Sequence, residues 1–324
     1  MSTLIKTVTA LPPTLAPAIE KAANFVRESV PENTRRAYAA DWAAFSEWCR
    51  IKRVAALPAD PRVVAAFVAD ESQRVRPASI RRRLASIAKM HKVSGHPSPT
   101  TVEPVPSTMK GIERTHGVAV RAKAPAVLAA VEKMVATLRT DTFDGLRNRA
   151  LLLVGFAGAF RRSELVGLTA DDLKWTDEGV AITVRRSKTD QRGEGKTKAI
   201  PYVPGSPVCA ATALKAWMTA ARIDRGPVFR PLDRTGVPKA RHMAPQSVAL
   251  LVKGCARAAG LDPKLYSGHS LRAGHVTEAR ARGVADSATM ATTGHTRVET
   301  LDMYDRRENV FQKTSAGDVL RPKR

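Results

Sequence analysis

The sequence predicts a mainly α-helical chain that folds into two domains and contains one small antiparallel β-sheet. Its 324 residues suffice for two domains of about 150 residues each. Apolar side chains recur at helical spacing through most of the chain, as at Val64, Phe67 and Val68. Residues 172–203 differ, because β-branched segments alternate there with turns rich in glycine and charge.

Residues 1–18 are expected to be a disordered tail, because prolines punctuate them and no amphipathic period develops. Helical periodicity begins after Pro31, where Asn33 or Thr34 is the expected N-cap. Apolar side chains follow at near-helical spacing at Tyr38, Trp42, Phe45 and Cys49. Stacking on nucleic-acid bases is one possible use of Tyr38, Trp42 and Trp48. Their spacing favours packing in a core instead.

Two further helices are expected in this half, one from Pro61 and one over residues 79–91. On the second, apolar side chains share one face, and basic side chains lie on or near the opposite face. The apolar set is Ile80, Leu84 and Ile87, and the basic set is Arg81, Arg82, Lys89 and Lys92. Residues 74–123 contain eleven Lys or Arg and two acids, Glu103 and Glu113. An ordinary solvated face is the simpler interpretation, but this excess favours contacts with phosphates.

The segment 114–125, RTHGVAVRAKAP, has little apolar content and is predicted to be a basic linker. It separates a helical domain, residues 19–113, from a larger domain, residues 126–324, that includes a C-terminal tail.

Within the larger domain, helical periodicity returns at 127–135, and the apolar run 150–160 is expected to be a core helix. The segment 172–203 predicts a small antiparallel sheet with two tight connections. Further helices are expected at 207–222, 245–259 and 269–282, with two short ones before and around Tyr304.

Charge narrows the class of partner. Lys and Arg total 53 and Asp and Glu total 30, so the net charge is +23. Such a surplus repels itself in a compact fold and favours a polyanion as partner, with nucleic acid ahead of an anionic membrane surface. The longest apolar run is too short for a membrane helix of about 20 residues, and no secretion signal is evident. Three scattered cysteines, Cys49, Cys209 and Cys255, are typical of reduced thiols in the cytoplasm.

Four segments of the second half carry residues suited to phosphate chemistry. GAFRRSELVGL contains Arg161 and Glu164 at a predicted helix start, and SGHSLRAGH contains His269 and Arg272, three residues apart on one helix face. RRSKTDQ places Lys188 near a hairpin tip, with Arg185, Arg186 and Lys196 as alternatives for its role. TTGHTRVETLDMYDR places His295 nine residues before Tyr304.

Together these side chains suit attack of a phenol on a phosphodiester. Two guanidiniums can grip the oxygens of one phosphate and stabilise the added charge of the transition state. A free phenol has a pKa near 10, so Tyr304 needs a base, for which His269 is the candidate. Lys188 is the candidate acid for the leaving oxygen. With this much positive charge the reaction needs no cofactor and no divalent metal, and the histidines lack a metal-binding spacing.

The order and spacing of these segments resemble the tyrosine recombinase (phage integrase) family. GAFRRSEL resembles its first arginine box, GHSLR its HxxR box, and Gly294-His295 followed by Tyr304 its last box. SIRRRLASIAKMHKVSGHPSP and VRAKAP are similar to the core-binding domain and linker of Cre-like members. The resemblance covers residues 30–310. Ala273 departs from it, since many relatives have His there.

The resemblance implies a role for each matching residue. Tyr304 would be the nucleophile that forms a 3′-phosphotyrosine and frees a 5′ hydroxyl. Arg161 and Arg272 would clamp the scissile phosphate, and Lys188 would protonate the 5′ oxygen. His269 would transfer protons. Two further residues complete the set: His295 would hydrogen-bond the phosphate, where Cre has Trp, and Glu164 would support the pocket.

The family further implies a SAM-like helical core-binding domain and a mixed α/β catalytic domain that form a clamp around duplex DNA. The expected activity is site-specific recombination through a Holliday junction, by a homotetramer on DNA built from monomers in the bacterial cytoplasm, associated with the nucleoid. The absence of an obvious arm-binding domain favours a simple Cre-like system. Expected DNA contacts are Arg81, Arg82, Lys89, Lys92, Arg121, Lys123, Arg241 and Gln246. Alternative functions are a type IB topoisomerase-like relaxing enzyme and a DNA-binding regulator with a silent site.

Overall fold

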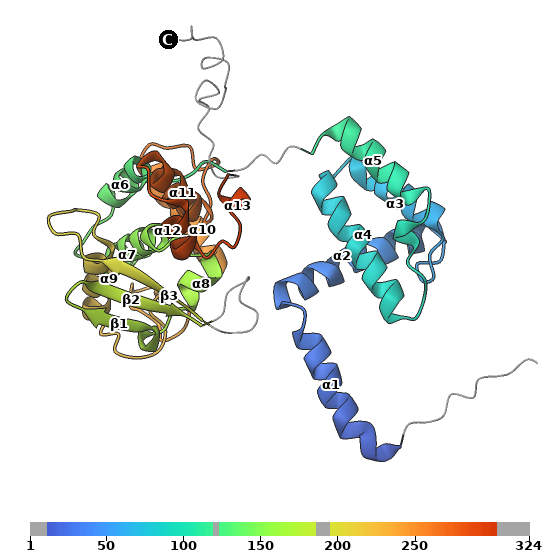
Figure 1. Ribbon diagram of the computed structural model, residues 1–324, viewed down its shortest axis with the longest axis horizontal. Coiled ribbons are helices and arrows are strands. Elements are labelled where there is room, and N and C mark those ends of the chain that lie inside the picture. The colour runs from blue at the N-terminus through green and yellow to red at the C-terminus, as the bar shows by residue number, and fades with distance from the viewer. Residues whose placement is uncertain (1–11, 119–122, 186–194, 303–324) are drawn as a thin grey trace, which may run out of the picture. The chain divides into compact units, whose positions relative to one another are not determined.

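The computed structural model describes residues 12–118, 123–185 and 195–302, and the structural statements below concern those residues. Contacts between α-carbons divide the chain into two units, Met1–Arg121 and Ala122–Arg324. The first unit is helical, and the second combines helices with one three-stranded antiparallel sheet (Figure 1). The predicted fold class, mainly α with a small antiparallel sheet, is therefore confirmed.

The three helices predicted in the first unit are present and enclose a separate core. Phe45, Phe67 and Ile80 are fully or almost fully buried there, and Trp42 and Trp48 pack against them. The prediction that these tryptophans belong to a core is thus confirmed. The elements are η1 (Pro13–Leu15), α1 (Ala16–Glu28), α2 (Glu32–Lys52), α3 (Pro61–Ser72), α4 (Pro77–Val93), η2 (Pro99–Thr101) and α5 (Val105–His116).

Two expectations for the N-terminal segment are wrong. Residues 13–18 belong to η1 and the start of α1, so the predicted disordered tail does not extend to residue 18. Pro17 lies in the first helical turn, where a missing N–H costs nothing, so it is compatible with the helix start. Helix α2 begins before Asn33 and Thr34, because the carbonyl of Pro31 already accepts hydrogen bonds from the backbone N–H groups of Thr34 and Arg35.

The second unit contains the expected helices and sheet. Helix α7 is buried along Ala150–Val154, as predicted for the apolar run, and packs against α9 and α11. The elements are α6 (Leu128–Ala136), α7 (Phe143–Ala157), α8 (Arg162–Gly167), η3 (Ala170–Asp172), β1 (Leu173–Thr176), β2 (Gly179–Val184), β3 (Lys196–Pro201), α9 (Ala210–Ala220), α10 (Pro245–Ala258), α11 (Ser270–Ala281), α12 (Asp286–Thr293) and α13 (Glu299–Asp302). No described helix is long and apolar enough to cross a membrane.

The sheet has the order β1-β2-β3 with antiparallel pairing throughout. The β1–β2 connection is a tight turn, since Thr176 pairs with Gly179. The described β2–β3 pairing runs from Gly179 and Pro201 to Val184 and Lys196. The second predicted connection falls between these ends, and its residues 186–194 lie outside the described residues.

The segment before α6 is bound to the second unit. Backbone N–H groups of Ala124 and Ala126 donate to the carbonyls of Leu265 and Ser270, each at 2.8 Å. A Cβ at Gly274 of α11 would lie 1.8 Å from the Ala126 carbonyl oxygen, so only glycine permits this approach. The end of the predicted linker is thus bound through Ala124 to the loop before α11, and the residue after the linker, Ala126, lies against α11. The first three residues of the linker belong to α5. All three cysteines are free thiols, and each is buried.

Candidate active site

Arg161 and Glu164 lie at the start of α8 and bind each other. The carboxylate of Glu164 accepts from the backbone N–H of Arg161 at 2.9 Å and from its Nη1 at 2.6 Å. Glu164 is buried, whereas about a fifth of the Arg161 side chain, 21%, is exposed. The carboxylate therefore caps the helix, and its bond to Nη1 fixes the orientation of the whole planar guanidinium.

Arg272 projects from α11 and is almost completely buried, with 1% of its surface exposed. Its Nη1 donates to the Ala159 carbonyl at 2.8 Å, so Arg272 contacts the turn that leads directly into Arg161. Its Nη2 lies 2.8 Å from Nε2 of His295. A guanidinium only donates, so this imidazole nitrogen accepts, and the proton of the ring is on Nδ1.

The HxxR box meets the first arginine box directly. His269 is exposed at the N-terminal end of α11, where its backbone N–H donates to Ser267 Oγ at 3.3 Å. A Cβ at Gly268 would lie 2.4 Å from Cδ of Arg162, so the loop before α11 packs on the residue next to Arg161. The first arginine box and the HxxR box thus meet at one turn, and His295 of the last segment lies beside Arg272.

The fourth segment reaches the site through α12 and α13. Gly294 ends α12 in a left-handed conformation, φ 72°, and delivers His295 to Arg272. Leu301 of α13 is fully buried, and Asp302 binds Arg280 of α11 at 2.9 Å. This anchor lies two residues before Tyr304 in the sequence. Tyr304 itself lies outside the described residues.

Lys188 and Arg186 also lie outside the described residues, so the choice of general acid stays a prediction. Of the alternatives, Arg185 is bound to the buried carboxylate of Asp172 at 2.5 Å. Lys196 is exposed at the start of β3, and its side chain lies beside Gly294.

A buried lysine that the sequence analysis did not single out completes the described site. Lys198 of β3 donates from Nζ to the Gly158 carbonyl at 2.6 Å. Burial lowers its pKa to about 8, with Glu164 opposing this effect and Arg272 and Arg161 adding to it. The sequence contained one indication that Lys198 is buried. In a strand, residues two apart lie on the same face, and Lys198 precedes the buried Ile200 by two residues.

Two histidines of the site, His275 and His295, are neutral near pH 7. Burial and then the Arg272 charge lower the pKa of His295 to about 4. Burial likewise lowers the pKa of His275, one turn after Arg272, to about 4, although its ring is hydrogen-bonded to the Phe156 backbone. Neutral imidazoles beside two guanidiniums leave a site whose charge is dominated by cations. Such a site is suited to an anion.

We expect this arrangement to weaken the fold in acid. Unfolded His275 takes up a proton near pH 6.5 and the folded residue only near pH 4, so the unfolded chain binds more protons between these values. The stability that neutral His275 contributes is therefore complete above pH 6.5 and is lost as the pH falls to 4. Urea unfolding at pH 7.5 and pH 5 should show a smaller loss for His275→Gln than for wild type. The exposed His242→Gln should keep the wild-type difference between the two pH values.

The basic residues predicted to contact DNA in the first unit are partly neutralised within it. Arg82 forms two hydrogen bonds to the buried Asp41, at 2.7 and 3.0 Å, and Arg81 pairs with Glu113 at 2.5 Å. Lys89 and Lys92 are exposed. Asp41 lies outside residues 74–123, yet its carboxylate neutralises Arg82 in the folded unit. The excess of positive charge around α4 is therefore smaller than the sequence of residues 74–123 indicates.

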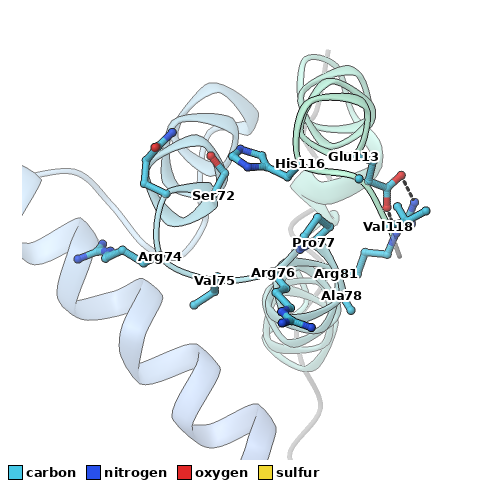
Figure 2. A pocket seen from close by; sticks show the side chains of 12 residues that line it. Ser72, Arg74, Val75, Arg76, Pro77, Ala78, Arg81, Glu113, His116 and Val118 are labelled. Carbon is cyan, nitrogen blue, oxygen red and sulfur yellow. Dashed lines mark hydrogen bonds and ion pairs between the residues drawn. The ribbon is translucent and has the colours of Figure 1, made fainter. Parts of the chain in front are cut away.

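The same region contains a pocket of about 600 Å³ between the start of α4 and the end of α5. Figure 2 shows Arg74, Arg76 and His116 around it, together with the Arg81–Glu113 pair. Arg76 is exposed at the N-terminus of α4 and was not among the predicted contacts. The pocket therefore adds basic residues to this end of the first unit and includes none of the catalytic candidates.

In the second unit the remaining predicted contacts differ in their surroundings. Gln246 is exposed at the start of α10 and accepts a hydrogen bond from Arg162 at 3.4 Å, which places it next to the candidate site. Arg241 is exposed in the preceding loop. Lys123 donates to the Lys264 carbonyl at 2.6 Å. Arg121 lies outside the described residues.

Fold and site together define a class of enzyme, the tyrosine site-specific recombinases. The pattern of the phage integrase family matches residues 128–309, and the chain belongs to this family. An integrase/recombinase XerD homologue of Selenomonas ruminantium is 37% identical over 295 residues, which covers 90% of this chain and 86% of that protein.

Two solved structures share the fold at low sequence identity. A lambda integrase dimer bound to a COC′ core site is 14% identical with a TM-score of 0.61, and the match covers 94% of this chain and 83% of that one. XerH recombinase in a post-cleavage complex with difH is also 14% identical with a TM-score of 0.61, covering 88% and 79%. The predicted family is confirmed, while the Cre-like subtype stays a prediction.

Proposed function

We propose that this recombinase cleaves and rejoins double-stranded DNA at a specific site through a 3′-phosphotyrosine intermediate on Tyr304. The observation that carries the proposal is the convergence of Arg161 and Arg272 on one turn. Arg161 follows that turn and is oriented by Glu164, and Arg272 donates to the carbonyl of Ala159 within it. Two guanidiniums held close to one turn are suited to binding the same phosphate together.

In the proposed reaction the Tyr304 oxygen attacks phosphorus, and the bond from phosphorus to the 5′ oxygen breaks. The phenol proton passes to His269, and Lys188 gives a proton to the departing 5′ oxygen. Arg161 and Arg272 stabilise the charge that develops on the phosphate oxygens. Religation is the reverse attack by a 5′ hydroxyl. Since the phosphotyrosine keeps the bond energy, ATP is not needed. Because the arginines, Lys188 and the imidazole donors supply positive charge, the proposed reaction also uses no metal cofactor.

The assembly that we propose follows from the same chemistry. Strand exchange between two sites requires four active subunits and passes through a Holliday junction, so we expect a homotetramer on DNA and a monomer free in solution. The complexes of XerH and lambda integrase with their substrate DNA support DNA as the partner. The domains 19–113 and 126–324 would surround the duplex, with contacts from Arg81, Arg82, Lys89, Lys92, Arg121, Lys123, Arg241 and Gln246. The bacterial cytoplasm, at the nucleoid, is the proposed location.

A nicked suicide substrate tests this function, because loss of the short product strand traps the covalent complex. Wild type is expected to give a denaturation-resistant protein–DNA species, and Tyr304→Phe none. Gel shifts with intact substrate should give equal affinities for both, since the phenol oxygen contributes to the reaction and little to binding. A covalent species with Tyr304→Phe, or none with wild type on its own recombination site, would contradict the proposal.

A further inference from the structure

Lys198 is a lysine inside the protein, beside the arginines of the active site. Its residue surface is only 6% exposed, and its side chain lies on the inner face of β3 together with Ile200. Besides its hydrogen bond to the Gly158 carbonyl, its Nζ lies 4.6 Å from the centroid of the Phe160 ring. An ammonium in this position loses its water and receives a carbonyl and an aromatic face in return.

The turn that Lys198 contacts is the one that leads to Arg161. Ala159 has a φ of 46°, a left-handed conformation that residues with a side chain seldom adopt. A Cβ at Gly158 would lie 2.2 Å from the Phe160 ring, so the turn is also tightly closed. A backbone of this kind persists only where its surroundings enforce it. Here Lys198 binds the Gly158 carbonyl and Arg272 binds the next one, that of Ala159.

The charges around Lys198 leave a positive surplus. Arg161 of α8, Arg272 of α11 and Lys196 of β3 lie near enough to act on it, and Glu164 is the one anion among these neighbours. The two histidines that face it, His275 and His295, have pKa values of about 4 and are neutral near pH 7. A bound phosphate would add a second anion beside these described cations, and a buried charge is favourable only when it is paired.

We propose that Lys198 is a positioning residue for the scissile phosphate: it holds the turn 158–161 so that Arg161 faces the DNA, and its charge attracts the phosphate. This inference rests on the proposed function for the reaction, but the conformation of the turn is testable without any reaction. Because Lys198 is buried under the turn, it acts through Gly158 and Arg161 and not by touching the DNA.

Lys198→Met tests the proposal in the full-length protein, with the exposed Lys174→Met of the same sheet as control. Hydrogen exchange of peptides that contain residues 158–161 is expected to be about 10- to 100-fold faster in Lys198→Met, which corresponds to loss of a hydrogen bond from a charged group. Covalent complex formation on the suicide substrate should slow by a similar factor. DNA affinity should change by less than about threefold, because most of it comes from other phosphate contacts.

Lys198→Arg keeps both the charge and the donor, and we expect it to recover most of the loss in Lys198→Met. A lysine with only a structural role would lower stability and DNA affinity together, whereas removal of a desolvated charge should leave the unfolding temperature close to that of wild type. If the methionine variant does not fold, Lys198→Gln, which keeps a donor and loses the charge, takes its place.

Wild-type exchange of the turn in folded Lys198→Met overturns the proposal, and so does wild-type cleavage by folded Lys198→Met or Lys198→Gln. If wild type itself forms no covalent complex, the proposed function fails, and the exchange measurement still decides whether Lys198 holds the turn. The two failures are therefore distinguishable.

Discussion

Arg272→Lys is expected to slow covalent DNA cleavage by at least about 100-fold, the usual effect of removing one preorganised group that stabilises the transition state. The substitution keeps the positive charge but removes the planar fork that reaches the Ala159 carbonyl and His295 at once. A lysine at this position binds one of these partners or the phosphate, and the buried carbonyl or imidazole is left without a donor. Single-turnover trapping on the suicide substrate measures the effect.

Arg282→Lys is the matched control for this prediction. Arg282 follows the last turn of α11, and its exposed side chain pairs with Glu278 at 2.8 Å. The same substitution there should leave the cleavage rate within about twofold of wild type, as is usual for exposed pairs. A wild-type rate in Arg272→Lys would mean that charge alone, without the fork geometry, supports the reaction.

Glu164→Gln is expected to impair both stability and cleavage. The carboxylate accepts two hydrogen bonds from Arg161, and its replacement leaves a guanidinium that is mostly inside the protein without its counter-charge. Loss of one partner from such a pair costs about 2–3 kcal/mol, at the lower end for buried pairs because Arg161 is partly exposed. For a unit of this size, that loss lowers the unfolding temperature by about 5–10 °C. Calorimetry measures this shift.

Cleavage by Glu164→Gln should fall by about 10- to 100-fold at a temperature where the protein is fully folded, because Arg161 is no longer oriented. Glu132→Gln, at an exposed position of α6 in the same unit, should match wild type in both assays. Reduced stability with unchanged cleavage would show that Glu164 supports the fold and leaves the orientation of Arg161 to other contacts.

Local sequence spacing predicted the central part of the site correctly. Arg161 and Glu164 are three residues apart at a helix start, and this spacing brings them into contact. The family resemblance assigned Arg272 and His295 to the same phosphate, but neither it nor periodicity predicted the contact between these two residues, which are 23 positions apart. The catalytic roles of these residues, and those of Tyr304 and Lys188, stay predictions.

The features of the site and of α4 that the sequence did not predict are contacts between residues far apart in the chain. Lys198 is one of several basic residues near the β2–β3 connection, and its alternation with Ile200 puts its side chain on the inner face. The partner that it meets there, the Gly158 carbonyl, is 40 positions away in the sequence. Arg82 and Asp41 are 41 positions apart, so a local count of charges treated Arg82 as unpaired. The prolines of residues 13–18 led to the wrong prediction of a disordered tail, because proline occurs in the first turn of a helix as readily as in a disordered segment.

The carboxylate partners of Arg81 and Arg82 affect how DNA binding responds to ionic strength. A guanidinium that keeps its internal partner releases no counterion from the duplex, since its charge is already balanced within the protein. The slope of log affinity against log salt concentration should therefore correspond to fewer phosphates than the surplus of 23 charges suggests. If the exposed Lys89 and Lys92 contact phosphates as proposed, they set most of that slope for α4.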